Sequence, residues 1–187
     1  RPLADVEYIL GELGNKDSLA PVLSGADLVF HLISTTVPQS SNESPIFDLQ
    51  SNLLDTVRFL DVCVECRVGK VIFLSSGGTV YGLPQLLPIT EKHPTNPICS
   101  HGIVKLAIEK YFQLYKHLYG LSYVILRPSN PYGPRQDPSG TQGVVAVFLG
   151  RIAKGLPVTI WGDGETVRDY FHVSELAEVC LAAATME

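Results

Sequence analysis

The sequence predicts an α/β fold with a doubly wound parallel sheet, on two observations. Short apolar runs such as residues 71–74 do not alternate with polar residues, which is typical of strands buried on both faces. Segments with apolar residues at helical spacing lie between these runs, so each strand can be followed by a helical crossover. Ligands of such sheets bind beyond the carboxyl ends of the strands.

The first part of the chain predicts two strands joined by one helix. Residues 27–33 are an apolar run followed by a polar loop over 34–44, and we expect a buried strand there. Apolar residues recur at helical spacing over 47–68, so we expect an amphipathic helix that ends at Gly69. Residues 70–75 are the second expected strand.

The middle of the chain predicts a long loop, a helix and a third strand. Gly77 and Gly78 open a turn-rich loop that contains four prolines. A helix is expected over 100–119, with Gly120 in the position of its C-cap. Residues 123–126 are the third expected buried strand.

The last part predicts shorter elements. We expect a helix over 144–154 and a short strand over 158–161. A final helix is expected over 174–185, with Ser174 as its N-cap.

Length and composition favour one folded domain. The 187 residues are 45% apolar and 18% charged, which is close to the average for globular proteins and excludes disorder, collagen and coiled coil. The net charge of -5 and the lack of a basic block argue against nucleic acid as a partner. No apolar run approaches the roughly 20 residues of a membrane span, so we expect no membrane partner.

The four cysteines fit reduced thiols as well as two disulfides, and we expect a cytosolic protein. Cys63 and Cys66 have the CxxC spacing, but no second pair or histidine cluster completes a metal site, so we expect no metal. Asn42 begins a glycosylation sequon that Pro45 follows, and we expect it to be unused.

Three loops follow the expected strands at residues 31–36, 75–82 and 127–134, where a ligand should bind. The second loop is rich in hydroxyls and glycines, so its donors can approach a ligand closely. Lys105 follows His101 by four residues, which puts both on one helix face, where a cation can shift the pKa of its neighbour. A solvated lysine beside an incidental histidine is the alternative interpretation.

Four segments occur in one order along the chain: the loop 75–82, the helix with Lys105, and the segments 126–134 and 161–173. This order resembles the extended short-chain dehydrogenase/reductase family. The resemblance is to the NAD-dependent epimerase/dehydratase group, which includes the UDP-glucose 4-epimerases, and it runs over essentially the whole chain.

This resemblance implies a Rossmann-like fold and a nucleotide-sugar epimerase. Residues 1–134 would be a partial NAD-binding Rossmann domain, 135–172 a substrate-binding segment, and 173–187 a helix that returns to the Rossmann domain. NAD is the implied cofactor for UDP-hexose 4-epimerisation, in which C4 of the sugar becomes a transient ketone. The resemblance also implies a cytoplasmic homodimer held through two helices of each subunit.

The resemblance assigns roles to individual residues. The implied catalytic residues are His101, Lys105, Thr79 and Ser76. The implied cofactor-binding residues are Glu12, Leu13, His31, Ile33, Ser34, Asn52, Ser75, Lys105 and Pro128. The implied substrate-binding residues are Asn130 at the sugar or its phosphates, Trp161 at the base and Arg168 at the diphosphate. Core packing for Trp161 and a surface ion pair for Arg168 are the alternatives.

The sequence departs from the family pattern in three ways. The glycine-rich phosphate-binding fingerprint has no counterpart, so we expect that the chain lacks the first βαβ unit. His101 stands where the family has a catalytic Tyr, and beside Lys105 its pKa should fall. Gly77 stands where the family has a catalytic Ser or Thr, which makes Thr79 the preferred replacement.

Two alternative functions follow from these departures. A member that binds nucleotide sugars could have lost turnover through Gly77 and His101. A nucleotide-sugar reductase or dehydratase is the other alternative. Dehydration is disfavoured, because Gly78 and Thr79 stand where the dehydratases have an Asp and a Glu that protonate a leaving hydroxyl.

Overall fold

The computed structural model describes residues 3–140, 142–160 and 162–186. The chain divides into two compact units, Arg1–Leu126 and Arg127–Glu187. Each unit has its own parallel sheet.

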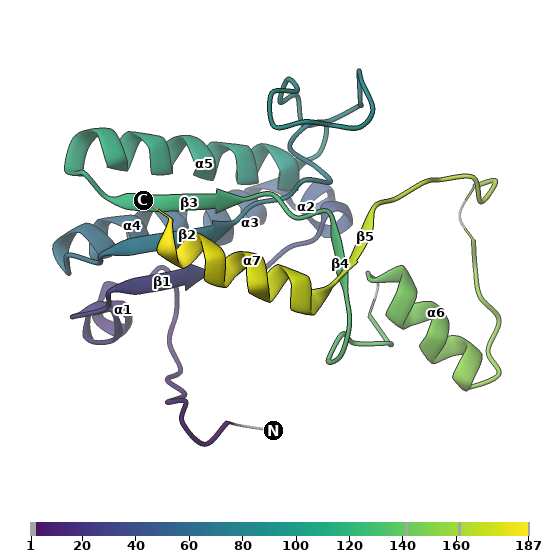
Figure 1. The fold of residues 1–187 in the computed structure, drawn as a ribbon, viewed down its shortest axis with the longest axis horizontal. Helices are drawn as coiled ribbons and strands as arrows, with labels where there is room; N and C mark the ends of the chain where they lie inside the picture. Colours follow the sequence, from purple (N-terminus) through teal and green to yellow (C-terminus); the bar gives the residue numbers. More distant parts are fainter. Residues whose placement is uncertain (1–2, 141, 161, 187) are drawn as a thin grey trace. The chain divides into compact units, whose positions relative to one another are not determined.

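The sheet of the first unit has three parallel strands in the order β1-β2-β3 (Figure 1). They are β1 (Leu28–His31), β2 (Lys70–Leu74) and β3 (Ser122–Leu126), close to the three strands that the apolar runs predict. All three strands end at the same edge of the sheet, because the pairing is parallel throughout. The predicted α/β class and parallel sheet are therefore confirmed.

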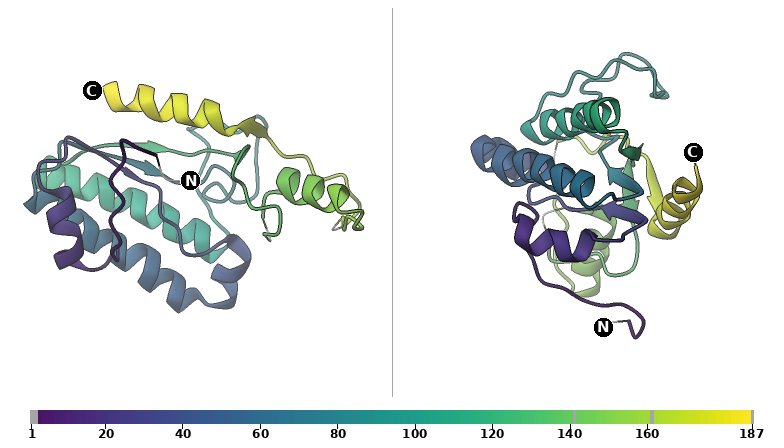
Figure 2. Two further views of the ribbon diagram at one scale, coloured as in Figure 1. Left: turned by 90° about the horizontal axis from the view of Figure 1, so that it is seen from below. Right: turned by 90° about the vertical axis from the view of Figure 1, so that its left-hand side faces the viewer.

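The helices of the first unit connect these strands. They are α1 (Lys16–Leu23), α2 (Pro38–Glu43), α3 (Pro45–Asp48), the π-helical turn η1 (Leu49–Leu54), α4 (Asp55–Glu65) and α5 (Ser100–Tyr119). Helices α1, α4 and α5 lie on one face of the sheet (Figure 2). The connections β1 to β2 and β2 to β3 both step in the same direction across the sheet. Since such crossovers are right-handed, their helices lie on the same face of the sheet. In the described part of the chain, no helix combines the length and hydropathy that a membrane span requires.

The core of this unit lies between the sheet and these helices. It includes Phe59 and Leu60 of α4, Phe73 of β2, and Ile108 and Phe112 of α5. Side chains alternate along β1, so Val29 packs on this core while Phe30 points to the other face and is 37% exposed. The expectation of strands buried on both faces is therefore wrong for Phe30.

Of the two helix ends that the sequence predicts at a glycine, one agrees with the structure and one differs. Helix α5 ends at Gly120 with φ +73°, as predicted. Helix α4 already ends at Glu65, and the left-handed residue after it is Arg67 with φ +56°, not Gly69. Gly69 is required for another reason, because a Cβ there would lie 2.5 Å from the Asp27 carbonyl oxygen.

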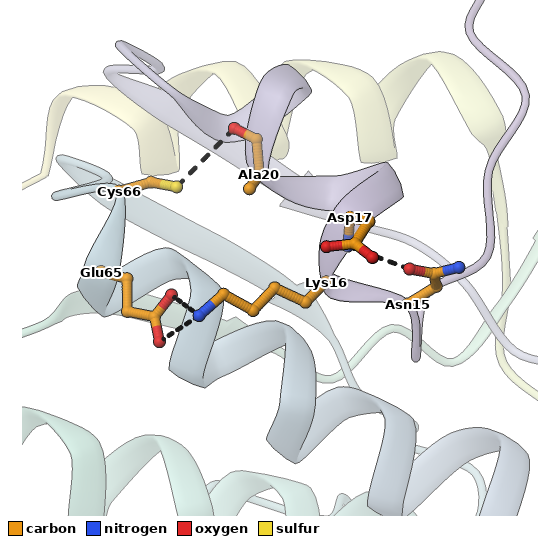
Figure 3. Close-up of polar contacts among 6 residues, drawn as sticks. All are labelled: Asn15, Lys16, Asp17, Ala20, Glu65 and Cys66. Atoms are coloured by element: carbon orange, nitrogen blue, oxygen red, sulfur yellow. Dashed lines mark hydrogen bonds and ion pairs between the residues drawn. The ribbon is translucent and has the colours of Figure 1, made fainter.

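Helix α1 docks on the end of α4 through polar contacts (Figure 3). Lys16 Nζ lies 2.6 Å from Glu65 Oε2, and Cys66 Sγ donates to the Ala20 carbonyl oxygen at 3.7 Å. Asn15 caps α1, because its Oδ1 accepts from the Asp17 backbone N–H at 2.9 Å.

The second unit is built on two short parallel strands, β4 (Asn130–Tyr132) and β5 (Tyr170–His172). Helices α6 (Val144–Ala153) and α7 (Val173–Thr185) match the two predicted helices.

Two predictions for the second unit are wrong. Residues 158–160 form no strand, because nothing in the described chain pairs with them. The N-cap of α7 is His172 rather than Ser174, since the His172 ring nitrogen accepts from the Ser174 backbone N–H.

Candidate active site

Lys105 lies at the carboxyl end of β2. It is 6% exposed, and its Nζ donates to the carbonyl oxygen of Leu74, the last residue of β2, at 2.9 Å. The same Nζ lies 4.8 Å from the centre of the Phe73 ring. Burial lowers the pKa of Lys105 to about 8, although the Asp48 carboxylate opposes this shift. The structure therefore buries an ammonium group at the sheet edge where ligands bind.

His101 stands one helical turn before Lys105, in the first turn of α5. Two side chains of α2 fix this turn. Ser41 Oγ accepts the His101 backbone N–H at 3.0 Å, and Asn42 Oδ1 accepts that of Ser100 at 2.9 Å. Burial lowers the pKa of His101 and Lys105 lowers it further, while Asp48 opposes both. The predicted downward direction is confirmed, and a neutral imidazole at pH 7 can accept a proton.

The loop after β2 comes very close to this helix turn. Gly102 makes the approach possible, because a Cβ there would lie 2.6 Å from the Thr79 carbonyl oxygen. Thr79 Oγ1 is buried without a hydrogen-bond partner in the described chain. An unpaired buried hydroxyl is costly, so it marks a position where a bound molecule can supply the missing partner.

The two serines of the same loop, Ser75 and Ser76, make different contacts. Ser75 Oγ donates to Glu109 Oε1 at 2.5 Å, so this buried hydroxyl joins the loop to α5. Ser76 is half-buried, and its carbonyl oxygen accepts the N–H of Val80 at 3.2 Å. A contact of Ser75 with a cofactor would therefore use its backbone.

The segment after β1 divides between core and surface. His31 is 3% exposed, and its Nε2 lies 2.9 Å from Thr56 Oγ1. Burial lowers the pKa of His31 to about 3, with a further contribution from Lys105, so its ring is neutral. Leu32 and Ile33 are 56% and 49% exposed, and Ser34 is also exposed. Only this outer part of the segment is open to a ligand.

Asn52 holds the segment in place rather than pointing outward. It is 5% exposed, its Oδ1 accepts the Thr35 N–H at 2.9 Å, and its Nδ2 donates to Asp48 Oδ1 at 2.9 Å. Asn52 lies in the π-helical turn η1, a feature that is frequent at functional sites.

Asp48 and Glu109 are the buried carboxylates that sequence analysis missed. Asp48 is fully buried, and it accepts hydrogen bonds from Thr36, Asn52 and Ser100. A single aspartate in a helical stretch has no distinguishing pattern, so no signal in the sequence could have identified it.

The two residues expected on the adenine side of NAD lie before α1. Glu12 is exposed, and its carbonyl oxygen accepts from Ser18 Oγ at 3.1 Å. Leu13 is half-buried and packs against the core.

The expected substrate residues all belong to the second unit. Asn130 Nδ2 donates to the Asp169 carbonyl oxygen at 2.9 Å, so its amide holds β4 to the chain before β5. Arg168 is exposed and makes no ion pair with any residue that the structure describes. Pro128 is half-buried, and Trp161 lies outside the described residues.

A hollow near β2 and β3 and the cysteines Cys63 and Cys66 lie apart from the candidate site. A hollow of about 200 Å³ between Val64, Arg67 and Leu121 lies near the amino ends of β2 and β3, the opposite edge from Lys105. Cys63 is buried in the core and Cys66 donates to Ala20, and no group of three potential metal ligands occurs among the described residues. All four cysteines are free thiols.

A parallel three-stranded sheet with a buried lysine at the carboxyl end of its middle strand, and a histidine one helical turn before that lysine, defines a Rossmann-like α/β protein. The chain belongs to the NAD dependent epimerase/dehydratase family, whose model matches residues 2–187.

Similar proteins agree with this membership. A UDP-glucose 4-epimerase of Mycolicibacterium smegmatis is 38% identical, over 84% of this chain and 50% of the relative. A dTDP-4-dehydro-6-deoxyglucose reductase of Escherichia coli is 37% identical, over 85% of this chain and 50% of the relative. The crystal structure of a Thermus thermophilus UDP-glucose 4-epimerase in complex with NAD has a TM-score of 0.92 and 34% identity, over 100% of this chain and 62% of that one. The chain thus spans between half and two thirds of the length of these proteins.

Proposed function

We propose that the whole protein is an NAD-dependent UDP-hexose 4-epimerase that acts through a transient 4-keto sugar. The observation that carries the proposal is the buried ammonium of Lys105 at the carboxyl end of β2, one helical turn after His101. The names of the M. smegmatis and T. thermophilus proteins support the reaction and the cofactor.

The chain's residues suit NAD in three respects. Leu32 and Ile33 offer exposed apolar surface directly after β1, Thr79 offers an unpaired hydroxyl, and Lys105 offers a cation that can bond a ribose hydroxyl. When bound, NAD would supply the hydride acceptor for C4 of the sugar, and in its reduced form the hydride donor.

His101 would take the proton of the C4 hydroxyl at a ring nitrogen and later give it back. Burial lowers the pKa of that imidazole, and charge repulsion from Lys105 lowers it further, so the ring stays neutral. In the second unit, Asn130 would hold the sugar or its phosphates, and the exposed Arg168 would clamp the diphosphate.

The test is interconversion of UDP-glucose and UDP-galactose by the whole protein with NAD, followed by NMR of the anomeric protons. We expect epimerisation, with Lys105→Met lowering kcat by about 100-fold or more. Lys110→Met is the matched control, because Lys110 is exposed on the same helix, and it should keep full activity. Absence of interconversion in the wild type would refute the proposal.

A member that binds nucleotide sugars without turnover is the second candidate, favoured by Gly77 and His101 at the two family positions for Ser/Thr and Tyr. Binding of UDP-glucose without epimerisation, restored by His101→Tyr, would support it. The E. coli relative favours a reductase as third candidate. Net oxidation of NADH by a 4-keto nucleotide sugar, without epimerisation, would support that reaction.

We also propose a cytoplasmic homodimer. Ile103, Tyr111, Leu114 and Leu118 are 36% to 55% exposed on one face of α5, which supports pairing with a second copy. The four free thiols fit a reducing compartment.

A further inference from the structure

Asp48 joins two parts of the candidate site that are far apart in the sequence. Its Oδ1 accepts from Thr36 Oγ1 at 2.7 Å and from Asn52 Nδ2 at 2.9 Å. Its Oδ2 accepts from Ser100 Oγ at 2.6 Å. Thr36 belongs to the segment after β1, and Ser100 is the first residue of α5.

Each of these contacts reaches a segment that the site uses. The segment that begins with Leu32 and Ile33 ends at Thr35 and Thr36. Asn52 accepts the Thr35 N–H and donates to Thr36 Oγ1. Ser100 directly precedes His101 in the helix turn that is capped by Ser41 and Asn42. One carboxylate therefore holds both the expected cofactor segment and the turn of the expected base.

Asp48 is also the negative charge that acts on both groups of α5. It raises the pKa of His101 and of Lys105, against the burial that lowers them. Lys105 in turn lowers the pKa of His31 on β1 and of His101 on α5 itself. Glu109 lies one turn further along α5 and binds Ser75.

We propose that Asp48 is a positioning residue. Its hydrogen bonds connect the segment after β1 to the first turn of α5, and its negative charge acts on the His101 imidazole and the Lys105 ammonium. The inference rests on the proposed function, because it takes this site to be the active site. Its test does not need turnover, so failure of epimerisation and failure of this proposal are separate results.

The charge is tested with Asp48→Asn, which keeps the size of the side chain and removes its charge. NMR titration of the His101 ring in the whole protein should give a lower pKa than in the wild type, because the imidazolium loses a stabilising anion. Asp55→Asn is the matched control, since Asp55 lies seven residues further along the same helical stretch and pairs with Arg58. Equal His101 titration in all three proteins would overturn the proposal.

The connection between the two segments is tested with two variants that keep the Asp48 charge. These variants also test the proposal if the Asp48→Asn protein fails to fold. Ser100→Ala removes the contact to α5, and Thr36→Val removes one contact to the segment after β1. Each variant should speed amide hydrogen exchange about tenfold at both Thr35 and His101, as expected for one lost hydrogen bond to a charged group. Faster exchange confined to the mutated side would show that Asp48 does not couple the two segments.

Discussion

Two histidines near Lys105 show how burial separates a structural role from a chemical one. His31 faces the core and bonds Thr56, whereas His101 stands half-buried at the start of α5. The sequence does not distinguish them, because each is a histidine next to an expected strand end or helix start. The fold does so, by turning one ring toward Phe59 and Phe73.

His31 should make stability depend on pH. Its folded pKa of about 3 lies below the ordinary 6.5, so the unfolded chain binds more protons between these values. The contribution is fully present above pH 6.5 and is lost as pH falls toward 3. Between pH 7 and 5 we expect a loss of about 2 kcal/mol in the free energy of unfolding, measured with urea. His31→Gln should reduce this loss, whereas His117→Gln, at an exposed position of α5, should retain it.

Gly102 should tolerate no side chain. In Gly102→Ala the new Cβ would lie 2.6 Å from the Thr79 carbonyl oxygen and 2.9 Å from Pro97 Cβ. We expect a loss of about 1–3 kcal/mol in thermal or urea unfolding. Gly78→Ala is the control, because nothing lies within 4 Å of its Cβ position, and a similar loss there would contradict this explanation.

At the residue scale, the sequence identified candidate residues near the strand ends but not the contacts that hold them. The pair His101 and Lys105 follows from helical spacing, and the loop 75–82 from its glycines. Asp48 and Asn42 could not be predicted, since they bond residues more than 50 positions away. Such contacts depend on tertiary structure, which a local sequence pattern does not predict.

At the scale of elements, the strong apolar periods predicted the long helices and the three-stranded sheet well. The weaker sequence patterns gave wrong predictions where the structure of a segment depends on the segment or group that it pairs with. Residues 158–160 have a β-branched pattern but pair with no strand in the part of the chain that the structure describes. The short strands β4 and β5, in contrast, form because they pair with each other. His172 replaced Ser174 as N-cap because its ring nitrogen also accepts a backbone N–H.

The left-handed residues after α4 and α5 give a matched pair of predictions. Arg67→Gly should raise the free energy of unfolding by about 0.5–1 kcal/mol, because φ +56° strains any residue with a Cβ. Gly120→Ala should lower it by about 1 kcal/mol, since Gly120 has φ +73°. Urea unfolding measures both, and shifts of the same sign would contradict the assignment.

At the scale of the whole molecule, the exposed apolar face of α5 should determine assembly. Leu114→Lys with Leu118→Lys places two charges on this face and should convert the proposed dimer to a monomer in light scattering. Leu86→Lys is the control, because Leu86 is 75% exposed in the loop between β2 and α5. A wild-type monomer, or a dimer that survives both changes, would refute the proposed interface.

The caps of α5 also bear on the order of folding. His101 depends on Ser41 and Ser100 depends on Asp48, across 60 and 52 positions of the chain. Such distant partners meet only after a long loop has closed, which is slow compared with the growth of a helix. The body of α5 can thus form early, while the turn with His101 matures only when the α2–α3 segment has docked. Nascent chains would therefore acquire their helical framework before the candidate site takes its final form.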